Sequence, residues 1–487
     1  MEEGCCVSAP GKVLVAGGYL VTLRPHPGLV FSVSARLYAA VGPAAAPASS
    51  PATLNGGADQ NEFGLVVDSP QFRKTFRFSA ALAAADGSSE PHLLLRNSSG
   101  EANEFIETTL VSALTAGVGL LGVDSFRARM GAGVVVTILG DAAFYSAPET
   151  PESEPKKTGL GSSAALVSSL VAALLSYLGL LDLSSAAPDV SRLQLAHNLA
   201  QYCHYKAQGK IGSGFDVSSA VFGSQIYTRF SPDVLLAVPA LQLAEGEVGQ
   251  GVMASPTTPA NMVAMLNSPL WDSKAESLQL PHGMHLLLGD ISVGAKTPGM
   301  VAAVDRWRHA LKDQGKLDDS AWTRLAGLNA QMIGHFRRLN ALADERRAAY
   351  ESTLERLAAL PADQGDGADE VVVTQLLALR AALVEVRRNL KLMGDLSGAA
   401  IEPDVQTQVC DATMALPGVL LAGVPGAGGM DALFAVALGA TAQAAELWAS
   451  RGISPLLLEE DHKGLCAHSM AYFADLRRRS VPNSASS

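Results

Sequence analysis

The chain has 487 residues, of which 48% are hydrophobic and 17% are charged, and this composition excludes a globally disordered chain. Its length allows two to four domain-sized cores. With 47 acidic and 36 basic residues the net charge is −11, which disfavours a protein that coats nucleic acid but is compatible with a local cationic pocket for a small anion. Five cysteines without metal-ligand spacing predict free thiols in a reducing compartment.

The first third of the chain predicts mainly strands. Apolar runs and alternation place strands at residues 13–21, 29–41, 72–78 and 133–139, and a helix at residues 103–117. Two proline-rich stretches, residues 43–60 and 147–155, predict a loop and an extended acidic connector.

An uncharged apolar run at residues 164–181 reaches the lower length limit for a membrane span. Serines dilute this run, and a glycine-rich turn leads directly into it. We therefore expect a helix buried between other layers, and no membrane span.

The second half mixes strands and long helices. The pattern predicts a strand at residues 285–290, helices at about residues 321–360 and 370–393 with a flexible segment at 361–367, an apolar run with glycines at 420–438, and a frayed tail after Arg479. Strands followed by mixed helices and strands favour an α+β or α/β protein with two packed domains that meet near residues 230–285.

The strongest local signal is Lys156-Lys-Thr-Gly-Leu-Gly-Ser-Ser-Ala-Ala165, which leads into the apolar helix. Gly159 and Gly161 permit a turn that directs the free N–H groups of the helix start to one point, where the helix dipole also favours an anion. The hydroxyls of Ser162 and Ser163 can bind phosphate or magnesium. The motif differs from Walker A, and an ordinary capped helix is the alternative.

Three weaker signals accompany this turn. Lys12, in Ser8-Ala-Pro-Gly-Lys12, is either a phosphate-binding or a solvated lysine. Asp216, in Gly209-Lys-Ile-Gly-Ser-Gly-Phe-Asp216, is either a helix cap or a catalytic carboxylate. The cluster Gly423-Val-Pro-Gly-Ala-Gly-Gly-Met-Asp431 allows either close approach of a ligand or a tight loop.

Together these elements resemble the GHMP kinase superfamily, whose lysine motif, phosphate loop and late glycine motif occur in the same order. Within it the chain is most similar to the eukaryotic phosphomevalonate kinases. The finer matches are spread over nearly the whole chain and include Ala207-Gln-Gly-Lys-Ile-Gly-Ser-Gly-Phe-Asp, Thr297-Pro-Gly-Met-Val and Ile401-Glu-Pro-Asp-Val-Gln-Thr.

The resemblance implies an α+β, two-domain GHMP kinase fold with the active site between the domains. Residues 1–230 would form an N-terminal domain like ribosomal protein S5 domain 2, and residues 231–487 a ferredoxin-like domain with a helical insertion and the glycine motif. The implied reaction uses ATP and Mg²⁺ to convert 5-phosphomevalonate into 5-diphosphomevalonate, in the mevalonate route to isoprenoids and sterols.

The resemblance also assigns residues to roles. Lys12 and Asp216 match the catalytic pair, and Ser163 and Asp216 are the implied metal ligands. The implied ATP-binding residues are Lys157, Gly159, Leu160, Gly161, Ser162, Ser163 and Ala164. The implied substrate contacts are Arg36, Lys210, Ser213, Lys296, Thr297, Gln406, Gly426, Gly428 and Gly429.

One departure concerns the metal. Mevalonate kinase has a glutamate about eleven residues before the catalytic aspartate, whereas His204-Tyr-Lys-Ala-Gln208 contains no acid here. The carboxylate ligand is therefore open, and Asp216 is the candidate for it. We expect His197 and His204 to be structural or surface residues.

Alternatives for function are a GHMP kinase with another acceptor such as mevalonate, a diphosphomevalonate decarboxylase, or a binding protein without turnover. Gly-Ser-Gly-Phe-Asp216 argues against the first two, and the presence of Lys12 with the intact loop argues against the third. We expect small-molecule partners only, in a monomer or homodimer. The expected location is the cytosol, with the peroxisome as the alternative, since the terminal Ser-Ala-Ser-Ser is not the Ser-Lys-Leu signal.

Overall fold

The structure is a computed structural model. It describes residues 4–44, 62–84, 91–146, 156–185, 188–238, 252–291, 297–318, 320–359, 368–439 and 441–480. The connector expected at 147–155, the flexible segment at 361–367, most of the loop at 43–60 and nearly all of the tail after Arg479 lie outside the described residues.

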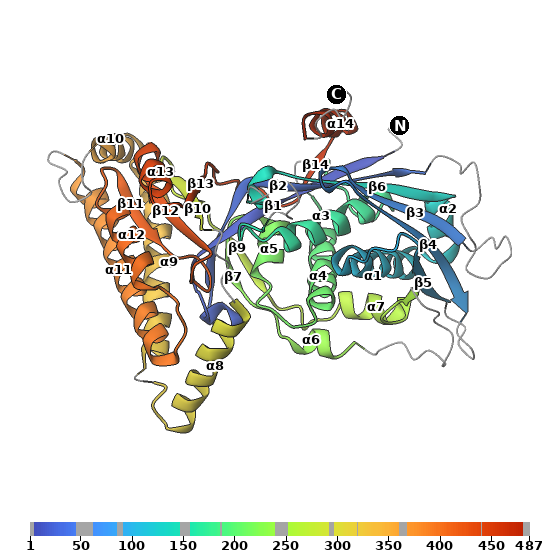
Figure 1. Cartoon of the computed structure of the whole chain (residues 1–487), viewed down its shortest axis with the longest axis horizontal. Coiled ribbons are helices and arrows are strands. Elements are labelled where there is room, and N and C mark those ends of the chain that lie inside the picture. The colour runs from blue at the N-terminus through green and yellow to red at the C-terminus, as the bar shows by residue number, and fades with distance from the viewer. Residues whose placement is uncertain are drawn as a thin grey trace.

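The described strands form one large and one small sheet (Figure 1). In spatial order, the main path of the ten-stranded sheet is β14 (Cys466–His468), β1 (Cys5–Ala16), β2 (Gly28–Pro43), β6 (Gly133–Gly140), β3 (Glu62–Ser69), β4 (Lys74–Ala84), β5 (Pro91–Asn97) and β8 (Val252–Ala254). Strand β7 (Gln225–Thr228) pairs with the start of β2 and with β9 (Lys274–Ser277). All pairs in this sheet are antiparallel except β3 with β6.

The strand expected at residues 13–21 is displaced. Strand β1 starts at Cys5, because a register shift between Pro10 and Gly11 accommodates the proline within the ladder. It ends at Ala16, since the chain then turns through Gly17 at a φ of 100° into the short helix η1 (Leu20–Thr22). The strand expected at 72–78 starts at Lys74 because Pro70–Phe72 forms a short 3-10 helix, η2.

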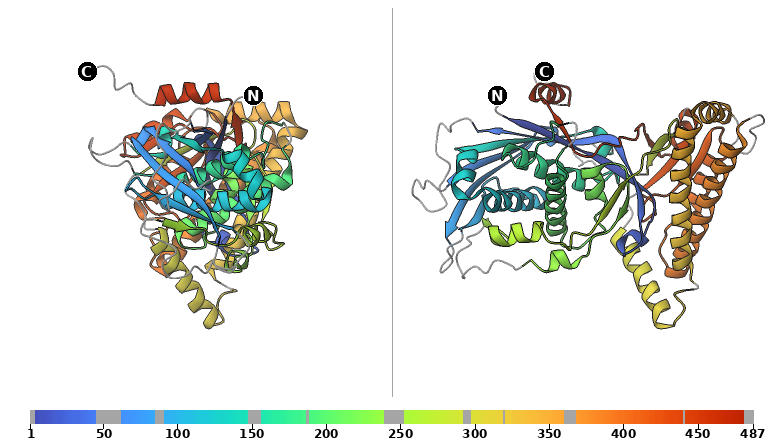
Figure 2. Two further views of the ribbon diagram at one scale, coloured as in Figure 1. Left: turned by 90° about the vertical axis from the view of Figure 1, so that its right-hand side faces the viewer. Right: turned by 180° about the vertical axis from the view of Figure 1, so that it is seen from behind.

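Helices cover one face of the large sheet, and α14 (Met470–Ser480) lies on the opposite face (Figure 1; Figure 2). The covering helices are α1 (Glu104–Leu121), α2 (Val123–Met130), α3 (Ser162–Tyr177), α4 (Val190–Gln208), α5 (Phe215–Phe222), α6 (Asp233–Leu236) and α7 (Pro259–Leu266). Another short 3-10 helix, η3 (Ala142–Phe144), follows β6.

The apolar run that includes residues 164–177 is helix α3, and it is buried as expected. It packs on β1 and β2 and against α1, α4 and α5, so nearly every side is covered by protein. Among the described residues, α1 is the one helix long and apolar enough to cross a membrane, and 61% of it is buried inside the protein. A core helix of this kind satisfies the same length and composition criteria, so the finding is weak evidence for a span.

The small sheet has the order β11 (Val419–Gly423), β12 (Ala432–Ala437), β10 (His285–Asp290) and β13 (Ser454–Leu456), all antiparallel. In chain order this is second, third, first and fourth, which is the ferredoxin-like arrangement. Its helices are α8 (Thr297–Asp313), α9 (Ala321–Glu345), α10 (Arg347–Ala358), α11 (Glu370–Ser397), α12 (Asp404–Met414) and α13 (Ala442–Ala449).

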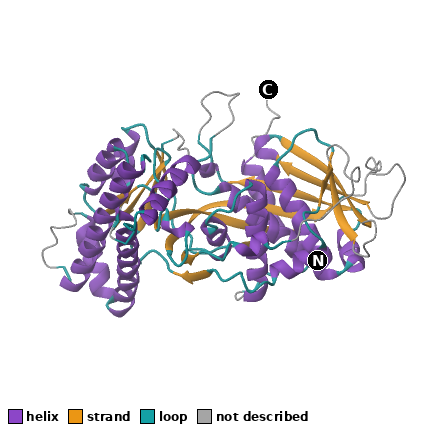
Figure 3. Cartoon of the chain, turned by 90° about the horizontal axis from the view of Figure 1, so that it is seen from below, coloured by secondary structure: helices purple, strands orange, loops and turns teal. Residues whose placement is uncertain are grey.

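Helices α9 and α11 pack along one another beside the small sheet, and Figure 3 shows helices packed against the strands in both halves of the molecule. The single helix expected at residues 321–360 is two helices, because Arg346 leaves the helical region at φ −132° and ψ 40°.

The two sheets are not built from two consecutive parts of the sequence. The expected domain boundary at residue 230 stays a prediction, but three strands beyond it, β8, β9 and β14, belong to the large sheet. The chain thus enters the small domain and then returns to the large one.

A buried arginine holds the segment that returns to the large domain before β14. The guanidinium of Arg36, which is 6% exposed, donates from Nε to Ser8 Oγ at 2.7 Å and from Nη1 to Asp461 Oδ2 at 2.6 Å. It also donates to the main-chain oxygen of Gly464, next to β14. Arg36 therefore joins β1 and β2 to the segment that leads into β14.

We predict that Arg36→Met lowers the free energy of unfolding by about 3 kcal/mol, because Asp461 and the main-chain oxygens of Ser8 and Gly464 lose their donor in a largely buried place. Arg337→Met is the matched control, since Arg337 pairs with Glu276 at the surface and its loss should cost less than about 1 kcal/mol. Urea denaturation followed by tryptophan fluorescence measures both. Equal effects of the two variants would contradict this role for Arg36.

Candidate active site

Two neighbouring cavities lie where the two domains meet. The inner cavity, of about 280 Å³, has walls from β1, from the turn before α3, from β10 and from the glycine cluster after β11. The outer cavity, of about 500 Å³, lies between α4, the turn before α5, and α8. Both are lined by Tyr19, Thr22, Ser213 and Val301, so the cavities adjoin.

The turn at residues 158–161 brings a lysine against the start of α3. Gly159 and Gly161 have φ angles of 74° and 82°, which other residues resist, and Gly161 is the N-cap of α3. The main-chain N–H of Lys12 donates to Leu160 O at 2.9 Å, and Lys12 Nζ donates to Gly159 O at 2.8 Å. No side chain caps α3, so its first N–H groups and Lys12 together favour an anion here.

Lys12 is a partly buried cation with two acidic neighbours. Burial lowers the pKa of its ammonium group, and the carboxylates of Asp216 and Asp431 raise it. The ring of Phe215 lies 5.5 Å from Nζ and covers another side. Phosphate oxygens in the inner cavity would supply the negative charge that best stabilises this cation.

Asp216 lies in the first turn of α5, whose N-cap is Gly214, so it is not the helix cap. Its carboxylate Oδ1 accepts the N–H of Val217 at 3.0 Å, and Oδ2 lies 4.0 Å from His204 Nε2. On the other side of the imidazole, Ser163 Oγ is 3.2 Å from the same nitrogen. The structure therefore gathers Ser163, His204 and Asp216 at the start of α3.

These residues fit Mg²⁺ by the chemistry of their donors. A hydroxyl and a carboxylate are the oxygen ligands that Mg²⁺ takes, together with phosphate oxygens and water. Among the described residues, no group of three or more His, Cys, Asp and Glu side chains can hold a metal by itself, so such a site needs the phosphates to complete it.

The glycine cluster packs against neighbouring segments of the site through main-chain atoms. Gly426 N–H donates to Leu14 O at 3.1 Å, and Gly429 N–H donates to Ile401 O at 2.7 Å. A Cβ atom on Gly428 would lie 2.2 Å from Ile401 O, and one on Gly18 would lie 2.3 Å from Gly426 O. These close approaches, rather than a loose turn, explain the glycines.

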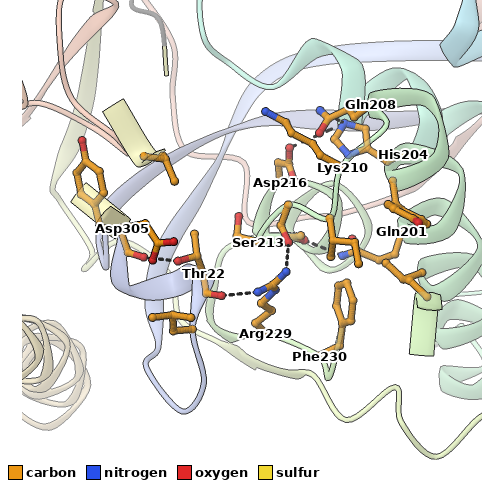
Figure 4. A pocket seen from close by; sticks show the side chains of 18 of the residues that line it. Thr22, Gln201, His204, Gln208, Lys210, Ser213, Asp216, Arg229, Phe230 and Asp305 are labelled. Atoms are coloured by element: carbon orange, nitrogen blue, oxygen red, sulfur yellow. Dashed lines mark hydrogen bonds and ion pairs between the residues drawn. The ribbon is translucent and has the colours of Figure 1, made fainter. Parts of the chain in front are cut away.

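The outer cavity is lined by polar groups of both signs (Figure 4). Lys210 is exposed at its edge, and Arg229 donates to the main-chain oxygens of Thr22 and of Gly212, the latter at 2.7 Å. The hydroxyl of the buried Tyr227 donates to Ser213 O at 2.9 Å and fixes that turn. The cavity offers cations and main-chain groups to an anionic ligand.

The structure brings most of the predicted site residues together. The predicted residues that line a cavity are Lys12, Gly159, Leu160, Lys210, Ser213, Asp216, Gly426 and Gly428. Gly161, Ser162, Ser163 and Ala164 form the start of α3 beside them. Lys157 is exposed nearby, with its Nζ 5.6 Å from the ring of Phe105. Gly429 supports the glycine cluster from behind through Ile401.

Four predicted substrate contacts need comment. Arg36 lines neither cavity, and its guanidinium donates hydrogen bonds to Ser8, Asp461 and Gly464. Its role in the structure is therefore to join segments of the protein rather than to contact the substrate. Gln406 is 2% exposed and its amide faces the sulfur of Met430 at 3.3 Å, so it packs behind the glycine cluster.

The other two are Lys296 and Thr297. Lys296 lies outside the described residues, and for Thr297 the structure describes only the main chain, which begins α8.

Sequence reasoning missed His204, which we expected to be structural or at the surface. It is 6% exposed, and burial lowers its pKa; the Asp216 carboxylate raises that pKa, and Lys157 and Lys210 lower it further. Arg229 and Asp431 were also missed as members of the site. The sequence gives one indication of this role. His204 lies one helical turn before Gln208, near the end of the helix that precedes Asp216.

Comparisons with known proteins agree with this geometry. Residues 130–224 match the family described as GHMP kinases N terminal domain. The chain is 35% identical to the peroxisomal phosphomevalonate kinase of Arabidopsis thaliana over 95% of both chains. It is 34% identical to phosphomevalonate kinase of Gibberella zeae, over 88% of this chain and 86% of that one.

The fold is similar to that of Streptococcus pneumoniae phosphomevalonate kinase in complex with phosphomevalonate and AMPPNP. The TM-score is 0.56 at 17% identity, covering 94% of this chain and 99% of that one. The two-domain α+β fold, with its glycine turn before α3 and its lysine on β1, is that of a GHMP kinase. Given 35% identity along nearly the full length of a relative, the chain belongs to the phosphomevalonate kinase family.

We predict different effects of alanine at two neighbouring glycines. Gly426 and Gly428 both have positive φ, of 65° and 74°, but a Cβ atom at Gly426 meets nothing within 4 Å. Gly426→Ala should cost about 1 kcal/mol of stability from backbone strain alone. Gly428→Ala should cost about 2 kcal/mol more and also weaken ATP binding, because the glycine cluster must move away from Ile401. Urea denaturation and ATP titration measure these effects; similar results for both variants would refute the close packing at Gly428.

Proposed function

We propose that this chain transfers the γ-phosphoryl group of ATP to the phosphate of 5-phosphomevalonate, giving ADP and 5-diphosphomevalonate. The observation that carries this proposal is the meeting of Lys12, the start of α3 and Asp216 where the two cavities adjoin. The acceptor comes from the relatives that cover nearly the whole chain, because they are phosphomevalonate kinases.

The two cavities would bind the two substrates separately. The inner cavity, between the turn at Gly159 and the glycine cluster, would hold the phosphates of ATP. The outer cavity, with Lys210 and Arg229 in its lining, would hold the anionic acceptor. The transferred group would then cross beside Lys12 and Ser213, at the junction.

The main barrier is the approach of two anions, since the acceptor is itself a phosphate. Its second pKa is about 6, so the attacking oxygen is largely deprotonated at neutral pH and needs no strong base. Asp216 would therefore orient Lys12, the metal ion or the acceptor rather than remove a proton. The charge of Lys12 would stabilise the phosphoryl group during its transfer. The N-terminus of α3 and Lys210 add to the neutralising field.

Ser163 and Asp216 are the side chains that we propose as ligands of Mg²⁺ in this reaction. These two side chains would hold the ion, which would supply positive charge to neutralise the phosphates of ATP.

The location and assembly of the protein stay predictions. The Arabidopsis thaliana relative is described as peroxisomal, which supports the peroxisome as the alternative to the cytosol for this chain. A monomer or homodimer is expected.

The acceptor is tested by measuring magnesium-dependent ADP release with 5-phosphomevalonate, with mevalonate and with no acceptor. We expect release with 5-phosphomevalonate alone. Turnover with mevalonate instead would keep the kinase and overturn the acceptor, whereas silence with all three would favour a binding protein.

We expect Lys12→Met to lower kcat by about two to three orders of magnitude without unfolding the protein, because the transferred group loses its buried cation. Lys206→Met serves as the control, since Lys206 is exposed on α4 and lines neither cavity. Steady-state kinetics and thermal melting of both variants test this role. Near-normal turnover of Lys12→Met would remove Lys12 from the mechanism.

We expect the fall of kcat/KM at high pH, its alkaline limb, to reflect deprotonation of Lys12. Burial lowers its pKa below the usual 10.5, so the free enzyme should lose the required positive charge, and hence activity, at a lower pH than an exposed lysine would. Asp431 raises this pKa, so Asp431→Asn should shift the alkaline limb to still lower pH. A limb that stays fixed, or moves to higher pH, would argue against this origin.

A further inference from the structure

A buried histidine holds the serine at the start of α3. His204, on α4, places Nε2 at 3.2 Å from Ser163 Oγ and at 3.1 Å from the amide nitrogen of Gln208, one turn further along its own helix. The carboxylate of Asp216 lies 4.0 Å from the same nitrogen, and Figure 4 shows His204, Gln208 and Asp216 grouped on one side of the outer cavity. The imidazole is 6% exposed, so water does not compete freely for these contacts.

These partners determine which atom carries each proton. The amide nitrogen of Gln208 has hydrogens and no lone pair to accept with, so it can only donate to His204. His204 Nε2 is therefore the acceptor and carries no proton. Ser163 Oγ faces the same nitrogen, so its hydroxyl hydrogen can share this lone pair with the Gln208 amide.

The direction of the Ser163 hydroxyl matters for metal binding. A hydroxyl binds a cation through its oxygen lone pairs, and a hydrogen that points toward the cation opposes binding. With the hydrogen directed at His204, the lone pairs of Ser163 Oγ are left for the side away from the imidazole.

We propose that His204 is a positioning residue, which accepts the Ser163 hydroxyl proton and thereby presents the serine oxygen to the metal ion bound with ATP. This inference rests on the proposed function only for the use of magnesium with ATP. Removal of a side chain that orients a metal ligand in this way typically changes metal affinity or activity by about 10- to 100-fold.

Two amide substitutions separate this role from simple packing. The Oε1 atom of a glutamine can take the place of His204 Nε2 and accept from Ser163. An asparagine places its amide near the position of Nδ1 and cannot reach. His204→Gln should therefore preserve the contact with Ser163, and His204→Asn should remove it, although both variants are neutral amides.

The readout is nucleotide binding without turnover. Calorimetry with AMPPNP, in excess Mg²⁺ and separately in EDTA, gives the gain in affinity that the metal provides. We expect His204→Asn to bind roughly tenfold more weakly with Mg²⁺ but within about twofold of wild type in EDTA. His204→Gln should recover most of the loss. Equal weakening in Mg²⁺ and EDTA, or failure of the folded His204→Gln variant to recover, would overturn the proposal.

A double-mutant cycle provides a second test. If His204 acts through Ser163, then His204→Asn should add little to the loss of Mg²⁺-dependent affinity already caused by Ser163→Ala. Additive losses would overturn the proposal. Should His204→Asn fail to fold, Gln208→Met serves in its place, because loss of the donor to Nε2 frees that nitrogen to take a proton and should give a smaller loss of the same kind.

These measurements are separable from the test of the acceptor. A wild-type protein that binds AMPPNP more tightly with Mg²⁺ but does not phosphorylate 5-phosphomevalonate would refute the proposed acceptor and leave the role of His204 open to the same experiment. Normal turnover of wild type, with His204→Asn unchanged in Mg²⁺-dependent binding, would refute the role of His204 alone.

Discussion

The site depends on a positive charge that is partly shielded from water. Lys12 projects from β1 to the start of α3, where it donates to the main chain of Gly159. Burial of an ammonium group is costly unless negative charge is close, and Asp216 and Asp431 supply it from the two domains. The same requirement makes the inner cavity attractive to phosphate, because an anion there completes the neutralisation.

Close main-chain packing keeps the two domains in the arrangement that this charge needs. Gly18, just after β1, allows approach of the glycine cluster, and Gly426 donates to Leu14 within β1. Behind the cluster, Ile401 O holds Gly429, and the next residue, Glu402, pairs with Arg387 in a place where both side chains are nearly buried. This buried ion pair therefore lies next to the residue that supports the glycine cluster.

A phosphate acceptor makes charge neutralisation the main task of the site. A phosphate acceptor is already ionised near neutral pH, so the protein must overcome repulsion more than it must remove a proton. The burial of His204 fits this picture, because its lowered pKa favours the neutral imidazole and leaves Lys12, Lys210 and Arg229 as the cations that line the cavities. In this arrangement a histidine in the site orients a hydroxyl rather than acting as a base.

Local sequence determined the parts whose geometry depends on near neighbours. The glycine turn at 159–161 and the buried helix after it follow from backbone freedom and apolar content alone, and Lys12 and Asp216 stand in motifs that predict their place in the site. Tertiary structure decided what depends on distant partners. Arg36 faces Asp461 instead of a ligand, and His204 meets Ser163, because packing of remote segments sets which buried polar groups find each other. No local pattern encodes those meetings, since each requires two stretches of chain to be brought together by the whole core.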